Sequence, residues 1–133
     1  MLIEKLFIDI PTVLVMALCQ VESGYNHKAI GDNGAAHGIL QIHKIVVDDV
    51  NRIYYSDGID AYTYEDRMSP TKSMEMCNLY LKHWGHSYFK KTGELPTQET
   101  LARIWNGGPN GWRKDATLKY WAKVQQALCT SKN

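Results

Sequence analysis

The N-terminal part of the chain contains an uncharged apolar run, PTVLVMALCQV, that extends from Pro11 to Val21 and leads directly into Glu22. The run has eleven residues, whereas a membrane-spanning helix needs about 20. Asp9 interrupts the apolar pattern upstream and no small-residue cleavage site follows it, so the pattern favours a buried helix over a signal peptide. The fixed φ of Pro11 suits a first helical turn, and Gly24 suits a helix end. The sequence therefore predicts a helix between these two residues.

Further helices are predicted by apolar positions at helical spacing and by helix-start residues. They cover residues 44–55, a segment with Ser69 as N-cap and Pro70 behind it, the segment that begins LPTQETLARIW, and a C-terminal segment with Leu118, Trp121, Val124 and Leu128 on its apolar face. We expect Gly85 to kink or end the helix that starts at Pro70.

Between the first two helices lies a loop over residues 25–38, in which Gly31, Gly34 and Gly38 break any regular pattern. No long stretch alternates between apolar and polar residues, so a short β-hairpin within residues 31–42 is the most that we expect of strands. The fold class predicted is mainly α, with one domain over residues 1–133.

Composition agrees with an ordinary soluble globular domain, because 44% of the residues are hydrophobic and 22% are charged. Residues 1–81 contain six basic and eleven acidic side chains, whereas residues 82–133 contain nine basic and three acidic ones. The basic C-terminal part suits either an anionic polymer such as a cell wall or a merely solvated face. No nucleic-acid-binding motif is present, so the chain is not expected to bind nucleic acid.

The cysteine and histidine spacings do not indicate a metal site or a disulfide framework. Cys19, Cys77 and Cys129 lie among apolar residues, so we expect all three to be small hydrophobic residues of the core. No metal or organic cofactor is expected.

An acid follows the first apolar run at the point where its helix should end. A carboxylate at a helix C-terminus faces the negative pole of the helix and unpaired carbonyl groups, and apolar neighbours remove water from it. Both effects raise the pKa of Glu22, which would let it act as a general acid near neutral pH. The alternative is an ordinary exposed glutamate.

A second acid, Asp32, lies ten residues further on in the sequence GDNG. Glycosidic bond cleavage needs a proton donor and often a second carboxylate, and the glycine-rich loop could return Asp32 towards Glu22. The alternative is a turn residue, which is a common use of aspartate.

Three motifs in order resemble the lysozyme superfamily. They are QVESG, then GDNGAAHGILQI, and then LARIWNGGPNG with TLKYWAKVQ behind it. The first two resemble elements of soluble lytic transglycosylases, and the third is similar to invertebrate-type lysozymes. The resemblance covers most of the chain, from about Cys19 to Gln125, and implies a single lysozyme-like domain.

The resemblance also implies roles for individual residues. Glu22 would be the general acid, Ser23 would help to fix the helix end, and Asp32 would lie near the second catalytic carboxylate. The residues implied to bind the glycan are Ser23, Gln41, Ile42, His43, Asn106, Gly107 and Tyr120. Of these, Asn106 and Gly107 would face Glu22, and Tyr120 would offer a hydroxyl or a stacking ring.

The activity implied is that of an N-acetylmuramidase, which hydrolyses the β-1,4 bond between N-acetylmuramic acid and N-acetylglucosamine in peptidoglycan. Two alternatives stay open. One is a lytic transglycosylase that leaves 1,6-anhydromuramic ends, and the other is a catalytically silent glycan-binding or structural domain. The expected partner is the glycan strand, bound by a monomer.

The chain lacks most of the cysteines of the disulfide-dense invertebrate-type lysozymes, and the segment RIYYSDGIDAYTYEDRM has no clear counterpart in them. With no signal peptide expected, the sequence suggests synthesis in a cytoplasm. Delivery to the cell wall would then follow, as for a bacteriophage lysis or virion enzyme or a bacterial protein with specialised export.

Overall fold

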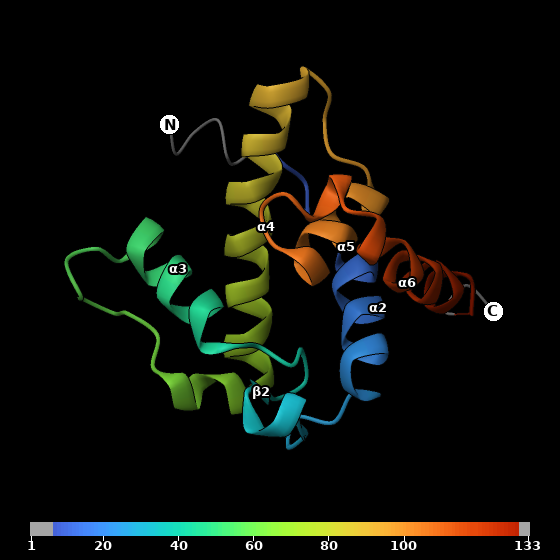
Figure 1. Cartoon of the computed structure of the whole chain (residues 1–133). Helices are drawn as coiled ribbons and strands as arrows, with labels where there is room; N and C mark the ends of the chain where they lie inside the picture. Colours follow the sequence, from blue (N-terminus) through green and yellow to red (C-terminus); the bar gives the residue numbers. More distant parts are fainter. Residues whose placement is uncertain (1–6, 131–133) are drawn as a thin grey trace. The chain divides into compact units, whose positions relative to one another are not determined.

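The computed structural model describes residues 7–130 of the chain (Figure 1). The described residues are mainly α-helical and contain a small two-stranded antiparallel sheet, which confirms the predicted fold class. They divide into two compact units, one formed by residues 22–80 and the other by the segments before and after it. The prediction of one catalytic domain over residues 1–133 stays a prediction.

The unit of residues 22–80 is built around a hairpin and two helices. Its elements are β1 (Ile30–Gly31), the 3-10 helix η1 (Asp32–Gly34), β2 (Ala36–His37), α3 (Lys44–Tyr54), the 3-10 helix η2 (Tyr64–Met68) and the first part of α4 (Pro70–Thr92). In the sheet Ile30 pairs with His37 and Gly31 with Ala36, so the predicted hairpin exists and begins one residue before the predicted range. Its largest fully buried side chains are Leu40, Ile42, Val47, Val50 and Met76.

The other unit is helical throughout its described elements. They are most of α2 (Thr12–Ser23), the second part of α4, α5 (Gln98–Gly107), the 3-10 helices η3 (Gly111–Arg113) and η4 (Asp115–Thr117), and α6 (Leu118–Thr130). Its largest fully buried side chains are Ile8, Leu14, Leu18, Leu81, Leu101, Ile104 and Val124. Helix α5 packs against η3 and α6.

Local signals at the helix ends act as the sequence predicted. Gly24 has φ +62°, the left-handed conformation that ends α2. The Ser69 hydroxyl accepts the backbone N–H of Lys72 at 3.2 Å and so caps the start of α4. The helices predicted at 44–55 and after LPT are α3 and α5, each within three residues of the expected start and end.

The expectation for Gly85 is wrong, because α4 continues through it to Thr92 as one helix (Figure 1). A Cβ at this position would lie 3.0 Å from Ile8 and 3.2 Å from Leu101. Gly85 therefore allows neighbouring side chains to approach the helix and does not break it.

The expectation for the cysteines is confirmed for Cys19 and Cys77, which are buried, and is wrong for Cys129, which is exposed. Cys129 follows the buried Leu128 on α6, and adjacent helical residues point in different directions.

Across residues 7–130 the helices are too short or too polar to span a membrane.

Candidate active site

Glu22 is the penultimate residue of α2 and is half-buried. The turn after it is fixed by Ser23, whose hydroxyl donates to the carbonyl oxygen of Ile39 at 2.8 Å. The same hydroxyl accepts the backbone N–H of Asn26 at 3.0 Å. Ser23 therefore joins the end of α2 to the loop that follows the hairpin, and the backbone next to Glu22 is held by hydrogen bonds.

The last turn of α2 carries no basic side chain, so this helix end supplies no cation of its own to offset its negative pole. Glu22, which the sequence predicts to be the proton donor, lies at this helix end. The protonation state of Glu22 stays a prediction.

Asp32 is the first residue of η1, at the tip of the hairpin. Its Oδ2 lies 2.8 Å from Nε2 of His43, the residue immediately before α3. The Asp32 side chain is 68% exposed and that of His43 is 45% exposed. The pair therefore holds in place a carboxylate that remains open to solvent.

Backbone strain is concentrated in the loop that carries Asp32. Asp32, Asn33 and Gln41 have φ values of +48°, +56° and +51°, and non-glycine residues in this region cost about 1–3 kcal/mol each. Such strain persists only where surrounding contacts determine the backbone, and it is commonest at functional sites.

Gln41 supplies several of these contacts. Its side-chain amide donates to the carbonyl oxygens of Ala29 (3.1 Å) and Gly38 (3.0 Å). The side-chain carbonyl oxygen of Gln41 lies only 2.3 Å from the position that a Cβ at Gly31 would take. Gln41 therefore braces the two sides of the hairpin loop against each other.

Ile42 is 1% exposed, and its backbone exchanges two hydrogen bonds with His37, at 3.1 and 3.0 Å. Its side chain belongs to the core of this unit, so a direct contact between that side chain and a glycan is not available in this conformation. Ile42 instead places its neighbours Gln41 and His43.

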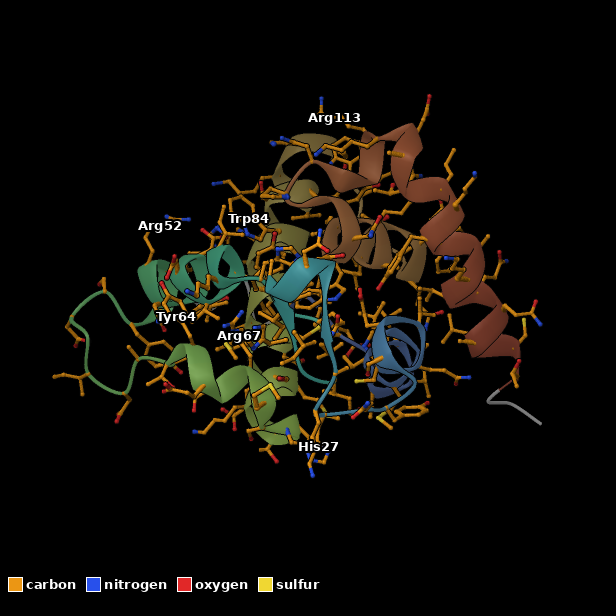
Figure 2. All side chains as sticks on the ribbon, turned by 60° about the horizontal axis from the view of Figure 1, so that its bottom comes forward. His27, Arg52, Tyr64, Arg67, Trp84 and Arg113 are labelled. Atoms are coloured by element: carbon orange, nitrogen blue, oxygen red, sulfur yellow. The ribbon has the colours of Figure 1, made fainter. Side chains whose placement is uncertain are left out.

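Arg67, on η2, is a residue that the sequence reasoning missed (Figure 2). It is 4% exposed, and its Nη1 donates to the carbonyl oxygens of Ala35 (3.3 Å) and Ile42 (3.1 Å). A Cβ at Gly38 would lie 1.8 Å from the carbonyl oxygen of Arg67, so η2 and the hairpin loop are in close contact. Burial lowers the pKa of Arg67. No periodic pattern marks a single buried arginine, so the sequence offered no signal for it.

The remaining candidates, Asn106, Gly107 and Tyr120, lie in the other unit. Asn106 is exposed near the end of α5, and Tyr120 is half-buried on α6. A Cβ at Gly107 would lie 2.6 Å from the Thr117 side chain, and the Gly107 carbonyl accepts from Lys114 Nζ at 2.8 Å. The end of α5 is therefore fixed by close packing and by a hydrogen bond.

Within residues 7–130, no three histidine, cysteine or acidic side chains lie together as potential metal ligands. In the unit of residues 22–80 the structure joins Asp32 to His43, and it ties Ser23 and Gln41 to the same loop. This arrangement offers acid–base groups on a braced backbone.

Residues 7–127 match the family described as Transglycosylase SLT domain. The chain belongs to this family. A curated relative of this SLT domain is a lysozyme from Magallana gigas, 37% identical over 73 residues that cover 50% of this chain and 53% of the relative. The chain thus spans about half the length of that relative.

A solved structure similar to this SLT domain is a chain of the complex between PliI of Aeromonas hydrophila and the lysozyme of Meretrix lusoria. The match has a TM-score of 0.71 at 24% identity and covers 88% of this chain and 89% of that chain. At this identity the likeness concerns the fold. Together these findings confirm the resemblance to the lysozyme superfamily.

Proposed function

We propose that this SLT domain is a peptidoglycan-cleaving N-acetylmuramidase, with Glu22 as general acid. Membership of the SLT family and similarity to a lysozyme support an enzyme that acts on glycan strands. The position of Glu22, half-buried at the end of α2, suits a carboxylic acid that must hold its proton until the leaving oxygen takes it.

The observation that supports cleavage by hydrolysis is the Asp32–His43 pair. A carboxylate that is 68% exposed and held at 2.8 Å by a histidine is accessible and oriented at once. Its strained backbone indicates that the loop keeps it in place at an energetic cost.

In this proposal the Glu22 carboxyl gives its proton to the glycosidic oxygen as the bond from the anomeric carbon breaks. Water then adds to that carbon and its proton passes to a carboxylate. Asp32 either takes this proton or first attacks the sugar itself. Carboxyl groups about 6.5–9.5 Å apart serve the first route and groups about 5–5.5 Å apart the second. The proposal assigns contacts with the glycan to Asn106, Gly107 and Tyr120.

A lytic transglycosylase is the second candidate, and the SLT family match favours it. In that reaction the 6-hydroxyl of the muramic residue replaces water, and the product carries a 1,6-anhydro end. Only the proton donor is then essential, and Asp32 with His43 would maintain the loop.

Mass spectrometry of purified peptidoglycan digested with the full chain separates these candidates. We expect reducing muramic ends. Anhydro ends would establish the transglycosylase instead, and the absence of any cleavage product would leave a silent glycan-binding domain and overturn the enzymatic proposal.

A further inference from the structure

A pocket of about 370 Å³ lies beside the Asp32–His43 pair, entirely within the unit of residues 22–80. It is lined by Gly34, Ala35, His43, Lys44, Ile45 and Arg67. Its lining therefore combines the positively charged side chains of Lys44 and Arg67 with apolar walls. His43 connects the pocket to the candidate catalytic carboxylate of Asp32.

Arg67 brings a buried positive charge to this pocket without an acidic partner. Its Nε donates to the carbonyl of Tyr64 at 2.8 Å, and both Nη1 bonds go to backbone carbonyls. The two N–H groups on Nη2 have no hydrogen-bond partner among residues 7–130. A guanidinium that is 4% exposed and lacks a counter-ion is costly, and a bound anion would offset that cost.

Neither of the nearby acids forms an ion pair with Lys44 or Arg67 among the described residues. Asp48 accepts the Tyr64 hydroxyl at 2.7 Å, and Asp32 is paired with His43. The ammonium of Lys44 lies over the Tyr64 ring, 5.0 Å from its centre, and forms no ion pair within the described part of the chain. Figure 2 shows Tyr64 and Arg67 on η2 close to α3.

The N-terminus of α3 opens onto the same pocket, because its first residues, Lys44 and Ile45, belong to the lining. The N-cap residue His43 makes no capping hydrogen bond with its side chain, since that side chain is engaged with Asp32. The N–H groups of the first turn and the positive pole of the helix therefore add to the attraction for an anion.

We propose that this pocket binds a carboxylate of the short peptide carried by the glycan strand. The guanidinium, the ammonium and the helix N-terminus match a carboxylate, and the apolar surface of Ala35 and Ile45 matches a small aliphatic side chain next to it. This inference rests on the proposed function, because that function identifies the peptide-bearing polymer. It goes further by assigning a subsite for the peptide and a role for Arg67 and Lys44.

Binding of a muramyl-containing disaccharide tripeptide to the full chain tests this subsite by calorimetry, against the same ligand with its peptide carboxylates amidated. The N-acetylglucosaminyl-N-acetylmuramyl ligand lacks the linkage that the enzyme is proposed to cleave. Amidation should weaken binding about tenfold, as for lost hydrogen bonds to a charged group. Equal affinity for the two ligands would overturn the proposal. It would also be overturned if inorganic phosphate competed for the pocket as strongly as the free carboxylate ligand does.

Lys44→Gln should weaken binding of the carboxylate ligand about two- to fivefold and leave binding of the amidated ligand unchanged. Lys123→Gln, an exposed lysine on α6, is the matched control and should behave as the wild type. Arg67→Lys should weaken binding further, provided that circular dichroism shows a folded protein. If Lys44→Gln binds the carboxylate ligand as tightly as Lys123→Gln does, the pocket does not hold the peptide.

Digestion of peptide-free glycan strands keeps this inference distinct from the proposed function. Cleavage of such strands together with equal binding of both disaccharide ligands would reject the subsite alone. Selective binding of the carboxylate ligand without any cleavage would reject the enzyme and retain the subsite.

Discussion

Glu22 is the residue on which the proposed chemistry depends. Glu22→Gln keeps the size of the side chain and removes the transferable proton, so we expect activity to fall by about 10²- to 10⁴-fold with little change in stability. Release of muramic ends from peptidoglycan measures the loss. The exposed Glu94 on the loop after α4 provides the control Glu94→Gln, which should be fully active. A loss of less than about tenfold for Glu22→Gln, an order of magnitude below the low end of general acid catalysis, would remove Glu22 from this role.

In the proposed function, Asp32 is the residue that distinguishes the two candidate reactions. Asp32→Asn keeps a side-chain oxygen near His43 but cannot accept a proton from water or attack the sugar. We expect at least about a tenfold loss of hydrolysis, because general base catalysis typically contributes about 10²- to 10⁴-fold. Asp57→Asn is the matched control, because an amide oxygen can still accept the N–H of Ile59 as the Asp57 carboxylate does at 3.0 Å. An active Asp32→Asn enzyme that yields anhydro ends would identify Asp32 as a turn residue.

The hairpin loop and η2 depend on close contact at Gly38. Gly38 and Gly58 have similar φ values, +85° and +81°, but only a Cβ at Gly38 would meet neighbouring backbone, at 1.8 Å. Gly58→Ala should therefore cost about 1–2 kcal/mol, the price of the left-handed conformation, and Gly38→Ala about 1–3 kcal/mol more. Denaturant titration of both variants measures the difference. Equal costs would show that η2 does not pack on the loop as described.

Helices α3 and α4 are joined within the unit of residues 22–80 by Tyr54, whose hydroxyl donates to the carbonyl oxygen of Leu79 at 2.9 Å. Burial, with a smaller effect of Tyr55, raises the pKa of Tyr54 from 10.0 to about 12. The native state therefore favours the neutral phenol, so this contribution is complete below pH 10 and is lost as the pH rises through about 12.

We expect the free energy of unfolding to fall between these pH values, and to fall less steeply in Tyr54→Phe. Burial also raises the pKa of Tyr62 and Tyr80, so part of the alkaline loss should remain in the variant. Denaturant titrations at a series of pH values give the two slopes, and identical slopes would contradict the assignment to Tyr54.

Helix ends could be predicted closely because their signals are local. Gly24 and Ser69 act within one helical turn of their position, and such chemistry is legible in the sequence. The contacts that brace Asp32 are different in kind. Arg67 reaches Ala35 and Ile42 across 32 and 25 positions of sequence, and no local pattern encodes a bond of that range. The role of Gly85 could not be predicted for the same reason. It depends on Ile8 and Leu101, which approach the helix from distant parts of the chain.

Across the whole molecule, the ordered motifs of the sequence identified the family correctly, as the SLT match over residues 7–127 confirms. The same motifs could not tell which residues are buried in the core and which line a pocket. Ile42 falls inside the GILQI motif and is a core residue at 1% exposure, whereas Lys44 and Arg67 lie outside the motifs and line a pocket. A motif therefore does not distinguish a side chain that fills the core from one that lines a pocket.

Stability of the whole chain should not depend on redox conditions. Cys19 and Cys77 are each 0% exposed and belong to the core, where a thiol packs as a small apolar group. We therefore expect the melting temperature to be the same with and without a reductant. Cys129 is exposed and can link two molecules under oxidation, so Cys129→Ser and a non-reducing gel serve as controls. A disulfide contributes roughly 2–4 kcal/mol, so a fall of many degrees under reducing conditions in Cys129→Ser would show that the two buried cysteines are bonded.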